Sequence, residues 1–98
     1  MTYEFVTSLG WNYCGLWNNR EFFTLDKRMI LEHQGSWYIC SKTDLYSREI
    51  NGECVLREYT QLINNILQCK NNPSNYTLEQ YLNAKKNLKK FLIRLKTK

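Results

Sequence analysis

The sequence predicts an α+β fold, in which an N-terminal antiparallel β-meander of about three to five strands packs against a C-terminal antiparallel two-helix hairpin. Short runs of aromatic and β-branched residues fill 1–41 and are separated by closely spaced turn residues. Apolar residues recur with a helical period over 53–70 and 77–96. The segment between these ranges is short and contains Pro73, so it predicts a tight connection between antiparallel helices.

The length and composition predict a single folded domain over 1–98. Two halves of a 98-residue chain would each be too small to hold a core. The chain is 43% hydrophobic and 14% aromatic, which is typical of a folded protein. No apolar run approaches the roughly 18 residues of a membrane-spanning helix. The start MTYEFVTSLGW lacks a basic segment followed by a long apolar one, so we expect no secretion signal and a cytoplasmic location.

The first forty residues read as consecutive strands. The expected strands are TYEFVTSL, WNYCGLW with either a bulge or a tight backbone approach at Gly15, EFFTL, RMILEH and SWYICS. Asn18-Asn19, Asp26-Lys27 and Gln34-Gly35 supply the turns between them. The signal is poor over 42–52, which we expect to be a loop that ends in the Asn51-Gly52 turn.

Two helices are expected after this loop. In the first, at 53–70, one face carries Val55, Leu56, Tyr59, Leu62, Ile63, Ile66 and Leu67. In the second, at 77–96, Thr77 is the expected N-cap and Gln80 completes a capping box. Its expected inward stripe is Leu78, Tyr81, Leu82, Leu88, Leu92 and Leu95, with Phe91 beside it. The two helices would cover the apolar face of the meander.

The charge is strongly polarised along the chain. Residues 1–69 hold six Lys or Arg and eight Asp or Glu, whereas 70–98 hold eight Lys or Arg and one Glu, a net charge of +7. Such a layout suggests an acidic partner. The candidate nucleic-acid-binding residues are Lys85, Lys86, Lys89, Lys90 and Arg94. Alternatively, these basic residues only form a solvated helix face. Contact with a membrane is disfavoured, because the leucine stripe is needed to cover the sheet.

The aromatic residues are the second candidate surface. Adjacent pairs such as Phe22-Phe23 and Trp37-Tyr38 point to opposite faces of a sheet, so one member of each pair faces away from the helices. Exposed Trp and Tyr side chains often anchor protein interfaces. The candidate partner-binding residues are Trp11, Tyr13, Trp17, Phe23, Trp37 and Tyr38. Alternatively, these aromatic residues form a second small core or a dimer contact.

Catalytic and metal-binding signals are weak. His33 is the only histidine, and the four glycines are scattered, so no phosphate-binding loop is formed. The cysteines are Cys14, Cys40, Cys54 and Cys69; none of them forms a C-x₂-C pair. We expect no catalysis, no metal and no cofactor, with mostly buried, reduced thiols; two disulfides are the alternative.

The sequence therefore predicts a non-enzymatic binding protein, although no family motif is matched over any stretch. In general style the chain resembles the small accessory proteins of phages and mobile elements, since it is compact, lacks a catalytic signature and is rich in Asn, Lys, Tyr and Ile. The resemblance implies an inhibitor of anti-CRISPR or other anti-defence type that blocks a host protein or nucleoprotein complex in the host cytoplasm. The alternative is a small basic nucleic-acid-binding protein. We expect a monomer or homodimer without a membrane partner.

Overall fold

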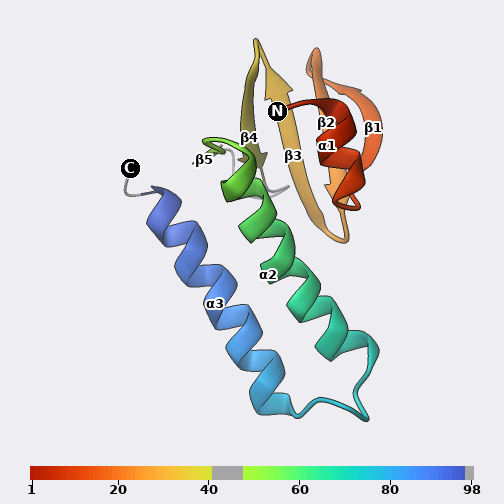
Figure 1. Cartoon of the computed structure of the whole chain (residues 1–98), viewed down its shortest axis with the longest axis vertical. Helices are drawn as coiled ribbons and strands as arrows, with labels where there is room; N and C mark the ends of the chain where they lie inside the picture. Colours follow the sequence, from red (N-terminus) through yellow and green to blue (C-terminus); the bar gives the residue numbers. More distant parts are fainter. Residues whose placement is uncertain (41–47, 97–98) are drawn as a thin grey trace. The chain divides into compact units, whose positions relative to one another are not determined.

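The computed structural model describes residues 1–40 and 48–96 and confirms the α+β class. The elements in chain order are α1 (Tyr3–Ser8), β1 (Asn12–Trp17), β2 (Arg20–Leu25), β3 (Arg28–His33), β4 (Ser36–Cys40), β5 (Arg48–Glu49), α2 (Glu53–Asn71) and α3 (Leu78–Lys96). The strands form one antiparallel sheet in the order β1-β2-β3-β4-β5 (Figure 1). The chain divides into two compact units, the sheet unit (Met1–Glu53) and the hairpin unit (Cys54–Lys98). The single domain over 1–98 and the covering of the meander by the helices stay predictions.

The first predicted strand is wrong, because TYEFVTSL contains the helix α1. Thr2 is its N-cap, and the Thr2 hydroxyl accepts a hydrogen bond from the backbone N–H of Phe5 at 3.1 Å. The hydroxyl of Ser8 donates to the carbonyl of Phe5 at 2.6 Å and satisfies a backbone acceptor at the other end. The alternation of Tyr3 and Phe5 resembled a strand, since a six-residue segment is too short to separate a period of 2 from one of 3.6.

The other four predicted strands and their turns are confirmed. Asn18 and Asn19 have φ values of 52° and 63°, the left-handed conformations that a tight hairpin turn requires. Asp26 and Gln34 also have positive φ, at 55° and 52°. Each turn occupies the two residues between paired strand ends, for example between Trp17 and Arg20. The register is therefore set locally by short loops.

The bulge, one of the two alternatives at Gly15, is also confirmed. Tyr13 pairs with Phe23 and Gly15 pairs with Phe22, so the register of β1 against β2 shifts between them. Gly15 has a φ of 96°, which a side chain would disfavour. The bulge lies on an edge strand of the sheet, where such an irregularity hinders the addition of a further strand.

The core of the sheet unit is aromatic and lies beneath α1. Tyr13 and Phe23 are cross-strand partners, so their side chains share one face of the sheet. The ring of Tyr3 on α1 meets the rings of Phe23 and Trp37 edge-on, with centroid distances of 5.3 and 5.6 Å. Val6 on α1 is fully buried. The short helix thus covers the face that carries Phe23 and Trp37.

The predicted loop at 42–52 falls partly outside the described residues. Within its described part, Arg48–Glu49 forms β5 and pairs with β4. Ile50 is buried, and its backbone N–H donates to the carbonyl of Trp37 at 2.8 Å. Gly52, at a φ of 100°, makes the turn into α2.

Both predicted helices are confirmed. Helices α2 and α3 are antiparallel and are joined by the short connection that contains Pro73 (Figure 1). The capping box of α3 forms in both directions. The backbone N–H of Gln80 donates to the Thr77 hydroxyl at 3.2 Å, and the backbone N–H of Thr77 donates to Gln80 Oε1 at 2.8 Å. This pair of bonds fixes where α3 begins.

The predicted inward stripe of α3 needs a correction at its N-terminal end. Leu78 and Leu82 are exposed, with 72% and 54% of their surface accessible, whereas Leu88 and Phe91 are buried. Tyr81, Ala84, Leu88, Phe91 and Leu95 recur at spacings of three and four residues and form the inner face instead. At 100° per residue, Leu82 lies about 120° around the helix from Leu88.

The contacts between α2 and α3 include a ring stack and an ion pair. The rings of Tyr59 and Phe91 stack, with centroids 5.6 Å apart and an interplanar angle of 12°. Nearer the C-terminus of α3, Arg94 Nη2 donates to Glu58 Oε1 at 2.8 Å. The inner face of α3 is therefore engaged with α2, and the opposite face is left for solvent or a partner.

Candidate binding surfaces

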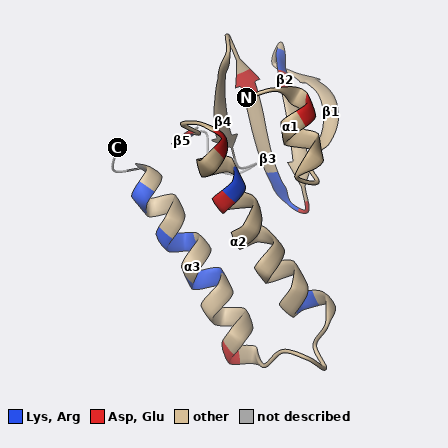
Figure 2. Ribbon diagram, viewed as in Figure 1, with Lys and Arg blue, Asp and Glu red and all other residues tan. Residues whose placement is uncertain are grey.

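The exposed part of α3 carries a group of lysines, which we call the lysine face: Lys86, Lys89 and Lys90 lie on the side away from α2, and Lys85 lies at its boundary beside Tyr81. Figure 2 shows basic residues in successive bands along α3, with one acidic band near its start. Helical geometry brings them together, because residues three and four positions apart are neighbours on a helix surface. Four positive charges on one exposed surface create a local positive potential.

Arg94 differs from the four lysines. Its guanidinium is paired with Glu58 and lies 5.6 Å from the centroid of the Phe91 ring. Part of its charge is therefore already neutralised within the hairpin unit. Of the five predicted nucleic-acid-binding residues, the structure brings Lys85, Lys86, Lys89 and Lys90 together and gives Arg94 a contact between helices.

Exposed apolar side chains accompany the lysine face. The order along α3 is Leu82, Lys86, Lys89 and Ile93, at intervals of four, three and four residues. These four side chains are therefore neighbours on the helix surface. Ile93 has 52% of its surface accessible. The sequence reasoning missed this feature, since it assigned Leu82 to the inward stripe. The angular position of Leu82 on the helix relative to Leu88 and Phe91 could have indicated that Leu82 is exposed.

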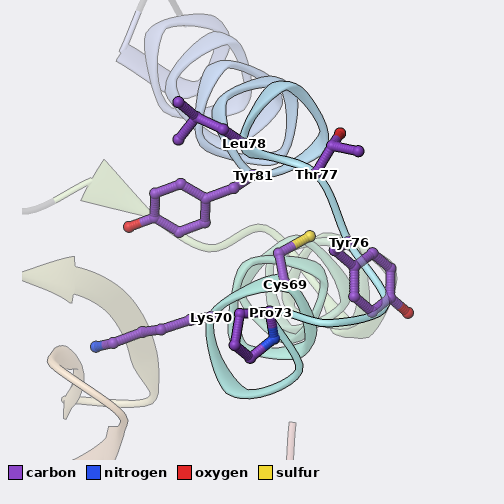
Figure 3. Close-up of a pocket in the computed structure, with 7 residues that line it drawn as sticks. All are labelled: Cys69, Lys70, Pro73, Tyr76, Thr77, Leu78 and Tyr81. Carbon is purple, nitrogen blue, oxygen red and sulfur yellow. The ribbon is translucent and has the colours of Figure 1, made fainter.

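A pocket lies in the hairpin unit where the two helices are joined (Figure 3). It is open to solvent and has a volume of about 330 Å³. Its lining residues are Cys69 and Lys70 from α2, Pro73, Tyr76 and Thr77 from the connection, and Leu78 and Tyr81 from α3. Most of this lining is apolar or aromatic. No pocket was predicted from the sequence, because 71–76 was interpreted only as a tight connection between the two helices.

The pocket adjoins the lysine face through one contact. Lys85 Nζ lies over the ring of Tyr81, 5.4 Å from its centroid. Tyr81 itself lines the pocket. A ligand seated in the pocket would therefore have a lysine of the lysine face close to it.

The six predicted partner-binding aromatics are divided by burial. Trp11, Phe23 and Trp37 are buried, with Phe23 and Trp37 in the cluster beneath α1. Tyr38 is half-buried; it pairs with Leu31 and Glu49 and lies on the sheet face opposite to Phe23 and Trp37. Phe23 and Trp37 are buried because α1 covers them, and this segment was predicted to be a strand.

Tyr13 and Trp17 are exposed and lie on the edge strand β1 together with exposed Leu16. We call these three residues the β1 patch; Tyr13 and Leu16 lie on the sheet face of Phe23, and Trp17 lies on the opposite face at the same edge. The hydroxyl of Tyr13 donates to Glu21 Oε1 at 3.1 Å, which holds its ring over β2. Leu16 was not among the predicted residues. The patch is the part of the predicted aromatic surface that a partner can reach.

The polar chemistry of the described residues is modest. His33 ends β3 and is half-buried, with its backbone paired to Ser36. Across residues 1–40 and 48–96, no group of three or more His, Cys, Asp or Glu side chains is placed to hold a metal ion. All four cysteines are free thiols, but the expectation that they are mostly buried is wrong for Cys14 and Cys54, which are exposed.

Comparison with protein-family models, curated proteins and solved structures finds no match for this chain. Within the part of the chain that the structure describes, no helix is both long and apolar enough to span a bilayer.

Proposed function

We propose that the protein is a non-enzymatic binding protein that attaches to a nucleoprotein complex and blocks it, in the manner of small anti-defence inhibitors. The observation that carries the proposal is the exposure of Lys85, Lys86, Lys89 and Lys90 on a helix whose inner face is engaged with α2. Each lysine placed on a phosphate releases condensed counterions, so four of them provide a substantial, salt-dependent affinity. The net charge of +7 over residues 70–98 attracts a polyanion from a distance.

The β1 patch supplies the contact to protein in this proposal. Tyr and Trp are enriched among the residues that dominate binding energy at interfaces, and Tyr13 and Trp17 are both exposed. Exposed Leu16 adds apolar surface on the sheet face of Tyr13, whereas Trp17 lies on the opposite face of the edge strand. The patch lies in the sheet unit and the lysine face in the hairpin unit, so each can be changed without altering the other.

A small basic nucleic-acid-binding protein is the second candidate function. The burial of Trp11, Phe23 and Trp37 favours it, because fewer aromatic side chains remain for a protein partner than the sequence suggested. In that case the lysine face alone carries the activity. A protein component would then be captured only through nucleic acid.

The first experiment measures nucleic-acid affinity as a function of salt. The wild-type protein, K86Q/K89Q/K90Q and Lys27→Gln are titrated onto a labelled oligonucleotide at several salt concentrations. Lys27 is an exposed lysine in the turn before β3 and serves as the matched control. We expect the slope of log K against log salt to fall by roughly 2 for the triple variant, at about 0.7 per phosphate contact on a single strand. The slope should not change for Lys27→Gln. Equal slopes for all three proteins would contradict a role for the lysine face.

The second experiment separates the two candidate functions. Immobilised protein is exposed to a lysate at low and high salt, with and without nuclease. A nucleoprotein inhibitor should retain one defined protein complex after nuclease treatment, and Y13A/W17A should lose it while Leu82→Ala keeps it. Capture of nucleic acid alone, lost at high salt, would leave only the basic nucleic-acid-binding function.

A further inference from the structure

We propose that the pocket at the joined ends of α2 and α3 holds an unpaired base of a single-stranded nucleic acid, whose phosphates continue along the lysine face. The inference rests on the proposed contact between α3 and nucleic acid and specifies which form of nucleic acid is bound. It is carried by the lining of the pocket, by the charges around it and by its position at one end of the lysine face.

The lining suits a flat aromatic ligand. Tyr76 and Tyr81 provide two aromatic side chains, and Pro73 and Leu78 add apolar surface. Figure 3 shows Tyr81 reaching from α3 and Lys70 from α2 toward the same side, with Cys69 labelled between them. Aromatic side chains bind bases by stacking on their faces, which are accessible only when the base is unstacked from its own strand. The volume of about 330 Å³ falls at the lower end of the range for small-ligand pockets.

The charges around the pocket suit a ligand that carries phosphates on both sides of its base. Lys70 lines the pocket from α2, and Lys85 lies 5.4 Å from the centroid of the Tyr81 ring. The lysine face then continues to Lys90, about 8 Å further along the helix axis at 1.5 Å per residue. A small aromatic anion bound alone would contact only one of these lysines. A strand with its base in the pocket would use the whole series.

A base within an intact duplex does not fit this arrangement. Its faces are covered by neighbouring bases, so Tyr76 and Tyr81 could reach it only after it had been extruded, which costs a few kcal/mol. A duplex would still meet the lysine face through its phosphates. The proposal therefore predicts a preference for single strands that arises from the pocket, above a background affinity for any nucleic acid that arises from the lysines.

The test compares nucleic acids and variants by fluorescence anisotropy at one salt concentration. The probes are an oligothymidine and an oligouridine of about 12 nucleotides, a duplex of the same length and thymidine monophosphate. The oligouridine arm distinguishes RNA from DNA. The variants are Tyr81→Leu, which removes the ring and keeps apolar volume, and K86Q/K89Q/K90Q. Lys27→Gln, at an exposed turn of the sheet unit, is the control. Circular dichroism verifies that each variant retains its helices.

We expect the single strands to bind at least about tenfold more tightly than the duplex. Tyr81→Leu should weaken single-strand binding by roughly 5- to 150-fold, the equivalent of about 1–3 kcal/mol for one stacked base. It should leave duplex binding unchanged, whereas the triple lysine variant should weaken both and Lys27→Gln neither. Equal affinity for strand and duplex, with no effect of Tyr81→Leu, would overturn the pocket proposal and leave the proposed function standing. Absence of binding to every probe would overturn both. Thymidine monophosphate binding as tightly as the oligomer would replace the strand by a free nucleotide and also overturn the inference.

A second measurement uses the wild-type protein, so it does not depend on how any variant folds. Cys69 lines the pocket and is half-buried, whereas Cys14 and Cys54 are exposed and lie outside the lining. Alkylation of each thiol by a maleimide is followed by mass spectrometry with and without oligothymidine. A strand in the pocket should slow the reaction of Cys69 several-fold and leave that of Cys14 unchanged. Unchanged alkylation of Cys69 at saturating oligothymidine would place the base elsewhere and refute the proposal.

Discussion

Arg94 on α3 and Glu58 on α2 form a hydrogen-bonded ion pair, with Nη2 and Oε1 2.8 Å apart, although the two residues lie 36 positions apart in the chain. Their side chains are 61% and 52% exposed, so water and salt screen the attraction. Glu58→Gln should therefore lower the free energy of unfolding by less than about 1 kcal/mol. Urea denaturation at low and high salt measures this, and the difference between the proteins should shrink at high salt. A loss of several kcal/mol at both salt concentrations would show that the pair is a principal tie between the helices.

The capping box of α3 gives a second expected outcome. The hydroxyl of Thr77 accepts a hydrogen bond from the backbone N–H of Gln80 at 3.2 Å. Thr77→Ala leaves that N–H without its side-chain partner and should cost about 1 kcal/mol. Thr77→Ser keeps the hydroxyl and should lose far less, as thermal unfolding followed by circular dichroism can determine. If the serine variant fell as far as the alanine variant, the methyl group of Thr77 rather than its hydroxyl would be the stabilising feature.

Tyr3 is expected to hold α1 on the sheet mainly through its ring. The ring lies edge-on to Phe23 and Trp37, and its hydroxyl donates to Glu32 Oε2 at the longer distance of 3.2 Å. Tyr3→Ala should cost about 1–2 kcal/mol, because the ring is only partly buried. Tyr3→Phe retains the ring and should cost less than about 1 kcal/mol. Chemical denaturation of the two variants separates these contributions, and equal losses would assign the anchoring to the hydroxyl.

The two faces of α3 can be distinguished by a matched pair of leucines. Leu88 is buried and Leu82 is exposed. Leu88→Ala removes buried methyl groups and should cost about 2–5 kcal/mol. Leu82→Ala should change stability by no more than about 0.5 kcal/mol, as is usual at surface positions. Urea denaturation of both variants measures the difference. A large loss from Leu82→Ala would mean that this face is covered and would argue against a free lysine face.

Local chemistry explains why the elements could mostly be predicted from the sequence. Asn18-Asn19 and Gln34-Gly35 accept the left-handed conformations of tight turns, and Thr77 with Gln80 marks the start of a helix. Among the described elements, β5 falls where a loop was predicted, and α1 was predicted as a strand although it had a cap of the same kind in Thr2. The residue three positions after Thr2 is Phe5 rather than Glu or Gln, so the capping-box pattern was incomplete in the sequence.

The surfaces were harder to predict than the elements. Helical periodicity alone allows Leu82 to join a stripe with Leu78, and only the packing of Phe91 against Tyr59 determines which face of α3 turns inward. The burial of Phe23 and Trp37 likewise depends on Tyr3 and on a helix that the sequence did not reveal. The lysines Lys86, Lys89 and Lys90 are exposed because they lie on the side of α3 away from Leu88 and Phe91, but their role in binding stays a prediction.

The division of the chain into two units also separates its fluorophores. All three tryptophans, Trp11, Trp17 and Trp37, belong to the sheet unit, whereas the aromatic residues of the hairpin unit are tyrosines and Phe91. Tryptophan emission is therefore an optical reporter of the sheet, and far-ultraviolet circular dichroism reports chiefly on the long helices α2 and α3. Coincident unfolding curves from the two signals would show one cooperative transition, and separate curves would show that sheet and hairpin melt independently.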